Sequence, residues 1–533
     1  MPTFERAWLG SVPAMRHEQH FGNRLVRCFA ERPRNAYELL ASAAARRPDG
    51  EALVCGNERL TYREFEGAVA RCAAGLTAVG IAKGDRVAML LGNGIAFPIL
   101  LFAALRIGAI AVPMSVREQS QGLAYMLRHC GARLLVCDAD VAERVPDPVA
   151  VPHLMRRVLI EPGASYRDMA LLADAPGGAP AMAEEEDTAI ILYTSGTTGQ
   201  PKGAMLAHLG ICHSALHYEC CMGLSSGDRA IAAVPLSHVT GIVALIVAMV
   251  RAAATLIIMP AFKAGDFLRL AARERMTHSL MVPAMYNLCL LEPGFEPAGH
   301  AAWRVGAYGG APMAPSTIAR FGELLPGLSL MNAYGATETT SPVTMMPPSE
   351  TAARSDSVGC AVPCADILVM DDEGREVPAG EEGELWLGGP MVVPGYWDNP
   401  AATAQSFVGG YWRSGDIGSK DADGYVRVFD RKKDMINRGG YKVYSVEVEN
   451  ALMGFPGVVE AAAVAMPCPV LGERVQAFVV MSDGANADAA LLRQHCARLL
   501  ADYKVPELFT VCDRPLPRNA NGKLMKRELR ATR

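Results

Sequence analysis

The chain has 533 residues, too many for one hydrophobic core, so we expect two or more domains. Half of the residues are hydrophobic and a fifth are charged, a balance that excludes an intrinsically disordered chain. A formal net charge of −5 and the lack of a dominant lysine–arginine run argue against a nucleic-acid partner.

The N-terminal residues are charged and contain no apolar stretch, so they do not predict a signal peptide. Residues 87–114 are the strongest candidate for a membrane span, but glycines, Pro98 and Arg106 interrupt them before about eighteen apolar residues are reached. They predict instead a strand, a turn, a buried helix and a second strand. Phe97 also stands where a dinucleotide-binding fingerprint would need its third glycine, so no such site is predicted.

Short β-rich runs alternate with helical segments up to about residue 355. The predicted strands are Arg86–Leu91, Ala132–Cys137, Ala189–Tyr193, Arg229–Val234, Thr255–Met259, Ser279–Val282, Trp303–Tyr308 and Ser329–Asn332. The predicted helices include Ala36–Arg47, Tyr62–Val79, Gly241–Val250 and Gly265–Arg275. This alternation predicts an α/β fold of parallel sheets covered by helices.

The pattern then changes to short strands separated by turns rich in glycine and aspartate, which predict a small antiparallel β unit. Its strands are Ile367–Met370, Gly383–Leu387 and Tyr425–Phe429. After the charged stretch Asp430–Asp434, the sequence predicts a small α+β domain. Its elements are the helices Val446–Met453 and Ala489–Ala501 and the strands Val458–Ala465 and Val475–Met481.

The fourteen cysteines are scattered along the chain. Cys360 and Cys364 lie close together, but no second pair and no histidine cluster completes a zinc site. We therefore expect reduced thiols in a cytoplasmic enzyme.

A loop of unusual composition follows the apolar run 189–192 and reads YTSGTTGQPKG from Tyr193 to Gly203. Glycines free backbone amides, and Ser and Thr hydroxyls add donors, so the loop is suited to the oxygens of a polyphosphate. Lys202 adds a mobile cation. The spacing differs from the Walker pattern, because Gln200 and Pro201 precede the lysine. A solvated linker is the alternative, and the strand directly upstream argues against it.

This loop resembles the phosphate loop of the adenylate-forming superfamily, which includes acyl-CoA synthetases, peptide synthetase adenylation domains and beetle luciferases. Segments similar to the other motifs of the superfamily follow in the same order. They are Pro235–His238, Asn332–Thr340, Tyr411–Asp416, Asp430–Asp434 and Asn519–Lys523.

The resemblance implies a large N-terminal AMP-binding domain, residues 1–430, of parallel sheets covered by helices with the small β unit. It also implies a small mobile α+β C-terminal domain, residues 431–533, with the hinge near 430–434 at Lys433. In the superfamily, a carboxylate attacks the α-phosphate of ATP, and the acyl group then passes to a thiol. The C-terminal domain swings between the two steps.

The resemblance also implies site residues. The catalytic residues would be His238, Thr337, Glu338 and Lys523, with Glu338 also holding Mg²⁺. ATP and AMP would be bound by Thr194, Ser195, Gly196, Thr197, Thr198, Gly199, Lys202, Gly310, Ala311, Pro312, Asn332, Tyr334, Gly335, Asp416 and Arg431. A CoA tunnel would be lined by a strand containing Arg438, Gly439 and Gly440. The acyl pocket would be lined by His238, Val239, Gly241, Tyr308 and Gly309.

Each charged residue also has a simpler interpretation. Lys523 alone would be a surface lysine, Asp416 a turn residue, and Glu338 an exposed or capping carboxylate. His238 remains open to interpretation as a core histidine. The chain also departs from the common motifs at Ser237, Lys442, Ser445 and Asn519, of which Lys442 bears on the second step and Ser237 on the acyl pocket.

We therefore predict an acyl-CoA synthetase that uses ATP, Mg²⁺ and CoA to activate an apolar carboxylic acid, with a medium- or long-chain fatty acid favoured. Three alternatives stay open: an aryl-acid CoA ligase, an adenylating enzyme that loads a carrier protein, and an inactive relative that acts as a ligand sensor. We expect small-molecule partners, no nucleic acid and no transmembrane segment. The oligomeric state is open, with a homodimer among the alternatives.

Overall fold

The structure is a computed structural model that describes residues 8–161, 165–169, 171, 173, 177–194, 200–482, 488–519 and 524–531. The chain divides into two compact units. The first comprises Met1–Ile367 and Leu387–Arg413, and the second comprises Leu368–Trp386 and Ser414–Arg533. The predicted domain boundary at residues 430 and 431 lies inside the second unit and stays a prediction.

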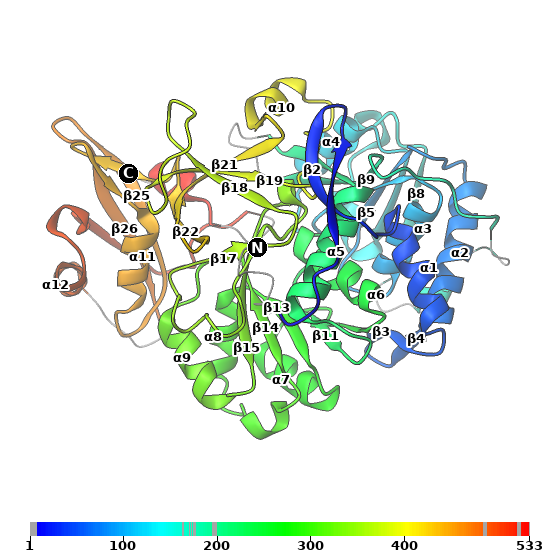
Figure 1. The fold of residues 1–533 in the computed structure, drawn as a ribbon, viewed down its shortest axis with the longest axis horizontal. Helices are drawn as coiled ribbons and strands as arrows, with labels where there is room; N and C mark the ends of the chain where they lie inside the picture. The colour runs from blue at the N-terminus through cyan, green and yellow to red at the C-terminus, as the bar shows by residue number, and fades with distance from the viewer. Residues whose placement is uncertain are drawn as a thin grey trace. The chain divides into compact units, whose positions relative to one another are not determined.

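One six-stranded sheet of the first unit carries the segment predicted to bind phosphates (Figure 1). Its strands lie in the order β10 (Lys202–Ala207), β9 (Thr188–Thr194), β6 (Ile110–Pro113), β5 (Arg86–Leu90), β7 (Leu134–Asp138) and β8 (Arg156–Ile160). Neighbouring strands are parallel except β9 and β10, which form a hairpin. Helix α4 (Ser120–Cys130) buries Leu123, Met126 and Leu127 against this sheet.

A second sheet of the first unit holds two further predicted nucleotide-binding segments, those with Gly310 and with Asn332. Its strands lie in the order β4 (Glu58–Thr61), β3 (Glu51–Cys55), β12 (Thr255–Ile258), β11 (Arg229–Ala232), β13 (His278–Met281), β14 (Val305–Tyr308), β15 (Ser329–Tyr334), β16 (Thr344–Met345) and β17 (Gly359–Ala361). The central strands from β3 to β15 are parallel. One face is covered by α7 (Ala264–Arg273), α8 (Pro283–Leu291) and α9 (Pro315–Leu324), which share a core with the sheet (Figure 1).

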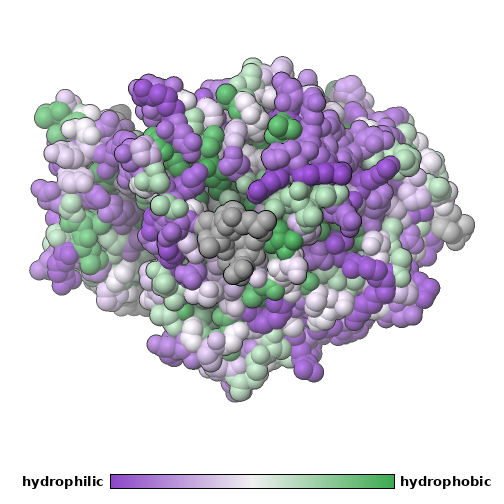
Figure 2. All heavy atoms as spheres, in the orientation of Figure 1, coloured by the Kyte–Doolittle hydropathy of each residue, from purple (hydrophilic) through white to green (hydrophobic). Residues whose placement is uncertain are grey.

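The remaining elements of the first unit are mostly buried helices. They are α1 (Ala36–Arg46), α2 (Tyr62–Ala78), α3 (Ala96–Arg106), α5 (His208–Met222), α6 (Ala248–Ala252) and α10 (Pro400–Ser406), with the strands β1 (Met15–His20), β2 (Arg24–Phe29) and β20 (Phe407–Val408). The expected parallel strands and helices are thus confirmed, including strand, turn, helix and strand over residues 87–114. No described helix is long and apolar enough to cross a membrane. On the face drawn in Figure 2, apolar residues are interspersed with hydrophilic ones.

One predicted helix has a different geometry. Residues Thr240–Val247 form a π-helix, η5, before α6 begins, where the sequence predicted an ordinary apolar helix over Gly241–Val250. Gly241 lies at the start of this helix, and a Cβ atom there would lie 2.4 Å from the carbonyl oxygen of Pro235. The backbone therefore crosses itself closely at the start of the helix, and only glycine fits.

The second unit combines a small β layer with an α+β layer. Strands β18 (Asp366–Met370), β19 (Gly383–Gly388), β21 (Tyr411–Lys420) and β22 (Tyr425–Arg431) lie side by side, and the first three have a few residues in the first unit. A five-stranded sheet is formed by β24 (Tyr441–Val443), β23 (Ile436–Arg438), β26 (Gly472–Met481), β25 (Val458–Cys468) and β27 (Leu508–Cys512), with α11 (Ser445–Met453), α12 (Ala489–Leu499) and α13 (Lys526–Ala531). The predicted small α+β architecture is confirmed.

Helix α13 is held to α11 by a buried polar contact. The Lys526 ammonium lies 2.7 Å from Oε1 of Glu449 and donates to Oγ of Ser445 at 2.6 Å. Burial raises the pKa of the Glu449 carboxyl, although the charge of Lys526 and a hydrogen bond from the Ala463 amide oppose this effect. The last described helix is therefore fixed to the body of its unit.

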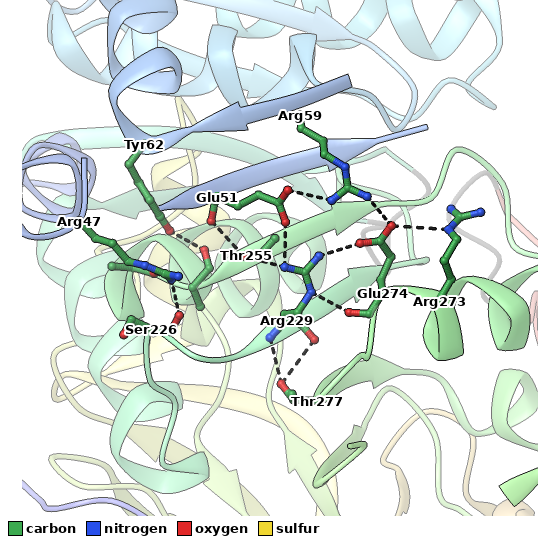
Figure 3. Close-up of polar contacts among 12 residues, drawn as sticks. Arg47, Glu51, Arg59, Tyr62, Ser226, Arg229, Thr255, Arg273, Glu274 and Thr277 are labelled. Atoms are coloured by element: carbon green, nitrogen blue, oxygen red, sulfur yellow. Dashed lines mark hydrogen bonds and ion pairs between the residues drawn. The ribbon is translucent and has the colours of Figure 1, made fainter. Parts of the chain in front are cut away.

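Two arginines and two glutamates form a closed ring that joins separate strands of the second sheet (Figure 3). Arg229 contacts Glu51 at 2.8 Å and Glu274 at 2.7 Å, and Arg59 contacts the same two carboxylates at 2.8 and 2.6 Å. Burial pushes the pKa of both carboxyls upward, but the hydrogen bonds from the two arginines outweigh it, so both pKa values lie below the usual range. The ring therefore stabilises the fold while both carboxylates are ionised.

Replacing Arg229 with methionine should lower the free energy of unfolding by about 1–3 kcal/mol, because the buried Glu274 carboxylate loses a partner. Chemical denaturation at pH 7 would measure this loss. Since both carboxyls have lowered pKa values, the ring stabilises the wild type above about pH 4.5 and ceases to do so as the pH falls further. The variant should therefore lose less stability than the wild type between pH 5 and about pH 3. Arg269→Met, which breaks an exposed pair with Asp266, is the control; equal behaviour of the two variants would contradict the prediction.

Candidate active site

The predicted phosphate loop closes the β9–β10 hairpin. Thr194, the last residue of β9, pairs across the hairpin with Lys202, the first residue of β10. The five residues between them that were predicted to contact phosphates, Ser195, Gly196, Thr197, Thr198 and Gly199, lie outside the described residues. The hairpin fixes the two ends of the loop next to each other, and each end carries a predicted site residue.

The second sheet brings further predicted residues to one edge. Strands β14 and β15 are parallel, and Tyr308 at the end of β14 pairs with Asn332 in β15. The segments that follow them, Gly309–Pro312 and Gly335–Glu338, therefore leave the sheet at its carboxyl edge, where ligands bind in open α/β sheets. Gly310 has a positive φ of 78°, which favours glycine in this turn.

Glu338 is the buried carboxylate of this edge, with 8% of its surface exposed. It lies in a 3₁₀ turn, η7 (Thr337–Thr339), which Thr339 caps by accepting the Ala336 amide hydrogen through its hydroxyl. Oε1 of Glu338 lies 3.3 Å from the Thr194 hydroxyl and accepts a hydrogen bond from the Tyr396 hydroxyl at 3.0 Å. Within the described part of the chain, Oε2 accepts no hydrogen bond. The hairpin and the sheet edge thus meet at Glu338.

Tyr396 is a residue that the sequence analysis missed. Its ring centroid lies 4.9 Å from the Lys202 ammonium, and its hydroxyl binds Glu338. The segment Gly395–Trp397 pairs with β10, because the Trp397 amide donates to the Gly203 carbonyl at 2.7 Å. Only the pairing of two segments almost two hundred residues apart places Tyr396 here, so no local pattern could have indicated it.

Residues predicted to line the acyl pocket lie in two places. His238 is half-buried, and its carbonyl accepts the Ile242 amide hydrogen. Val239 directly precedes the first residue of η5. Tyr308 is buried in the core formed with α7, α8 and α9, and burial raises its pKa to about 12. Gly241 and Gly309 both face backbone, since a Cβ on Gly309 would lie 2.4 Å from the Ala333 carbonyl oxygen.

The two predicted ribose contacts are neighbours in the second unit. Asp416 pairs with Arg431 across β21 and β22, and Nε of Arg431 lies 2.6 Å from Oδ1 of Asp416. Asp416 is buried, whereas Arg431 is partly exposed. One oxygen of the carboxylate is thus held by a guanidinium that also reaches solvent.

The predicted hinge and CoA-tunnel residues follow in the same unit. Lys433 lies in an exposed turn, and Arg530 of α13 donates to its carbonyl at 3.2 Å. Residues 437–442 were predicted to be one strand, and this was wrong. They form a hairpin of β23 and β24, because Gly439 and Gly440 have positive φ values of 61° and 92° and make the tight turn. Arg438 pairs with Glu507 at 2.8 Å, and Lys523 lies outside the described residues.

Comparison with known proteins supports the enzyme family that the sequence motifs predicted. Residues 40–397 match the model of the AMP-binding enzyme family, and residues 447–523 match that of the AMP-binding enzyme C-terminal domain. A feruloyl-CoA synthase of Amycolatopsis sp is 36% identical over 91% of this chain and 96% of its own length. The long-chain-fatty-acid–CoA ligase FadD13 of Mycobacterium tuberculosis is 32% identical over 89% of this chain and 93% of its own.

Solved structures support the same family. The o-succinylbenzoate coenzyme A synthetase of Bacillus subtilis, in complex with ATP and magnesium ion, superposes with a TM-score of 0.83 at 28% identity. The match covers 94% of this chain and all of that one. The fold is that of an adenylate-forming enzyme. The chain belongs to the AMP-binding enzyme family, and it is an ATP-dependent, AMP-forming acid–thiol ligase of the acyl-CoA ligase class.

Proposed function

We propose that this enzyme is an acyl-CoA synthetase. It would convert a carboxylic acid and ATP to an acyl-adenylate and pyrophosphate, and then transfer the acyl group to CoA with release of AMP. The observation that carries the proposal is the meeting of Glu338, Thr194 and Lys202 where the phosphate hairpin reaches the carboxyl edge of the second sheet. Residues 1–430 would form the AMP-binding domain and residues 431–533 the mobile domain.

The residues present fit a magnesium ion. Mg²⁺ takes oxygen ligands, usually one or two carboxylates together with substrate phosphates. Glu338 offers a buried carboxylate whose Oε1 is held by two hydroxyls and whose Oε2 accepts no hydrogen bond from the described residues. When bound, magnesium supplies charge stabilisation to the departing pyrophosphate.

The chain's own groups would reduce the repulsion between two anionic reactants. Lys202 would lie beside the phosphates, and Lys523 would approach the carboxylate and the α-phosphate. Thr337 and the turn Gly310–Pro312 would orient the nucleotide, since Thr337 precedes Glu338 at the same sheet edge. Asp416 would accept hydrogen bonds from the ribose hydroxyls, and Arg431 would hold the Asp416 carboxylate in place. This pair would position the nucleotide without taking part in bond making.

The second step would require the C-terminal domain to swing at Lys433. The exposed turn that contains Lys433 is suited to a large change of backbone angles. The hairpin with Gly439 and Gly440 at its tip would then line the path of the pantetheine thiol. A glycine pair at a hairpin tip allows an extended ligand to pass close to the backbone.

Replacing Gly440 with alanine should slow thioester formation from acyl-adenylate and CoA by about tenfold, at an unchanged rate of adenylation. The added methyl meets no atom within 4 Å, so the effect would come from backbone strain at a φ of 92° in the hairpin tip. The two half-reactions would be measured separately. Gly374→Ala is matched in strain, with a φ of 78° and equally open space, and should leave both rates unchanged. Equal losses in both half-reactions of the Gly440 variant would contradict the prediction.

For the acid, we propose an aryl acid of the hydroxycinnamate kind. The 36% identity to a feruloyl-CoA synthase supports it. A fatty acid is the second candidate, favoured by the 32% identical long-chain-fatty-acid–CoA ligase.

Acid-dependent exchange of labelled pyrophosphate into ATP would test the proposed function. A panel of hydroxycinnamates, benzoates and fatty acids of graded length would be scored by this exchange. We expect the hydroxycinnamates to give the highest kcat/KM, and a preference for long fatty acids would exclude the aryl assignment. Comparing CoA with a phosphopantetheine-bearing carrier protein would identify the thiol, and no exchange with any acid would overturn the proposal.

A further inference from the structure

We propose that Tyr396 is a positioning residue that keeps the Glu338 carboxylate and the Lys202 ammonium apart and aligned for magnesium and the ATP phosphates. This inference rests on the proposed function, in which Glu338 holds the metal ion. It assigns a role to a residue outside the motif segments from which the family was predicted.

Tyr396 gives Glu338 a neutral partner. Its hydroxyl donates to Oε1 at 3.0 Å, and the Thr194 hydroxyl lies 3.3 Å from the same oxygen. Both partners are uncharged, so they orient the carboxylate while leaving its full negative charge for a cation. Within the described residues, Glu338 forms no ion pair, although it is only 8% exposed.

The ring of Tyr396 gives Lys202 a neutral partner in the same way. The ammonium lies 4.9 Å from the ring centroid, within the range of a cation–π contact. Such a contact directs the lysine without cancelling its charge. Among the described residues Lys202 has no carboxylate within ion-pair distance, so its charge stays available to a phosphate.

One side chain therefore separates two opposite charges that would otherwise attract each other. A direct Lys202–Glu338 ion pair would neutralise both groups and shorten the reach of each. Tyr396 contacts the ammonium with its ring and the carboxylate with its hydroxyl, so the ammonium stays available to a phosphate and the carboxylate to a metal ion. The phenol is suited to this role because it combines an apolar face with one polar atom.

The fold holds Tyr396 firmly. Its amide donates to the Thr403 hydroxyl at 3.0 Å, and its ring packs edge-on against Phe407 with 5.5 Å between the centroids. The neighbouring Gly395 carbonyl accepts the Met205 amide hydrogen at 3.1 Å, which ties the segment to β10. Tyr396 is 5% exposed. The phenol is thus held by contacts from the protein itself.

Two substitutions separate the two contacts. Tyr396→Phe keeps the ring near Lys202 and removes only the hydrogen bond to Glu338. Tyr396→Leu removes both contacts. The matched control is Tyr37→Phe, because the Tyr37 hydroxyl donates to Glu66 at 2.7 Å and the Arg106 guanidinium lies 5.0 Å from its ring centroid. The control therefore makes the same chemical change at a tyrosine that also contacts a glutamate and a cation, but whose Arg106 and Glu66 pair directly at 3.1 Å.

Binding of α,β-methylene ATP would be measured by calorimetry with and without Mg²⁺. We expect Tyr396→Phe to reduce the gain in affinity from Mg²⁺ by about tenfold while leaving metal-free binding unchanged. Tyr396→Leu should also weaken metal-free binding, since Lys202 would be free to pair with Glu338. Tyr37→Phe should change neither quantity. If Tyr396→Phe keeps the full Mg²⁺ gain, or loses metal-free affinity equally, the inference is overturned.

The pyrophosphate exchange of the wild type keeps the two proposals distinct. A wild type without acid-dependent exchange would refute the proposed function. A wild type that exchanges, together with a Tyr396→Phe variant whose Mg²⁺ gain is intact, would refute the role of Tyr396 alone. If Tyr396→Leu does not fold, Tyr396→Phe decides by itself, because it removes a single oxygen atom and retains the packing of the ring.

Discussion

Replacing Lys523 with alanine is expected to slow adenylate formation by about 10²–10³-fold, the value of one preorganised donor at a developing negative charge. The acid and ATP both carry negative charge, and the proposed role of the lysine is to approach the point where that charge concentrates. Thioester formation from supplied acyl-adenylate and CoA should remain intact, since the adenylate no longer needs this cation. The substitution should therefore separate the two half-reactions.

The two rates would be measured by pyrophosphate exchange and by thioester formation from synthetic acyl-adenylate. Lys504→Ala is the control, because Lys504 pairs with Glu447 elsewhere in the second unit and has no proposed part in either step. Equal losses in both half-reactions of the Lys523 variant would show that the lysine does not act selectively on adenylation.

Replacing Glu338 with glutamine should lower kcat/KM for adenylation by at least about 10²-fold, because an amide is a poor ligand for a hard cation. Glutamine has the same shape and still accepts hydrogen bonds from the Tyr396 and Thr194 hydroxyls, so the fold should persist. Raising Mg²⁺ should restore part of the activity if the lost function is metal binding.

The matched substitution for this second test is Glu66→Gln. Glu66 also accepts a tyrosine hydroxyl, from Tyr37, and also lies near a cation, Arg106. It is remote from the phosphate hairpin in sequence, and the substitution should leave adenylation within about twofold of the wild type while lowering stability slightly. If added Mg²⁺ does not raise the activity of the Glu338 variant and its Tm is lowered, Glu338 has a structural role instead.

Much of the fold followed from the sequence because buried parallel strands are continuous apolar runs. Strands β5, β9 and β12 begin within two residues of their predicted starts. The motif segments were equally readable, since each combines rare residue types at fixed spacing. Their order along the chain predicted the family that the comparisons confirmed.

Three features were missed in the prediction, each for a physical reason. The π-helix at Thr240–Val247 begins beside a close backbone contact at Gly241, and periodicity indicates neither feature. The turn at Gly439 and Gly440 was taken for a strand interior, although paired glycines favour a hairpin tip. Tyr396 contacts Lys202 and Glu338 through long-range pairing alone. Local patterns do not report such distances.

The contact between Lys526 and the pair Glu449 and Ser445 sets a limit on the tail of the chain. Three residues of extended chain span at most about 11 Å, so Lys523 cannot travel farther than this from the anchored Lys526. Unravelling of the last residues would thus extend the range of Lys523 very little. To move its charge over a longer distance, the whole α+β layer would have to move as one body. The contacts of Lys526 with the Ser445 hydroxyl and the Glu449 carboxylate would hold the tail to that body.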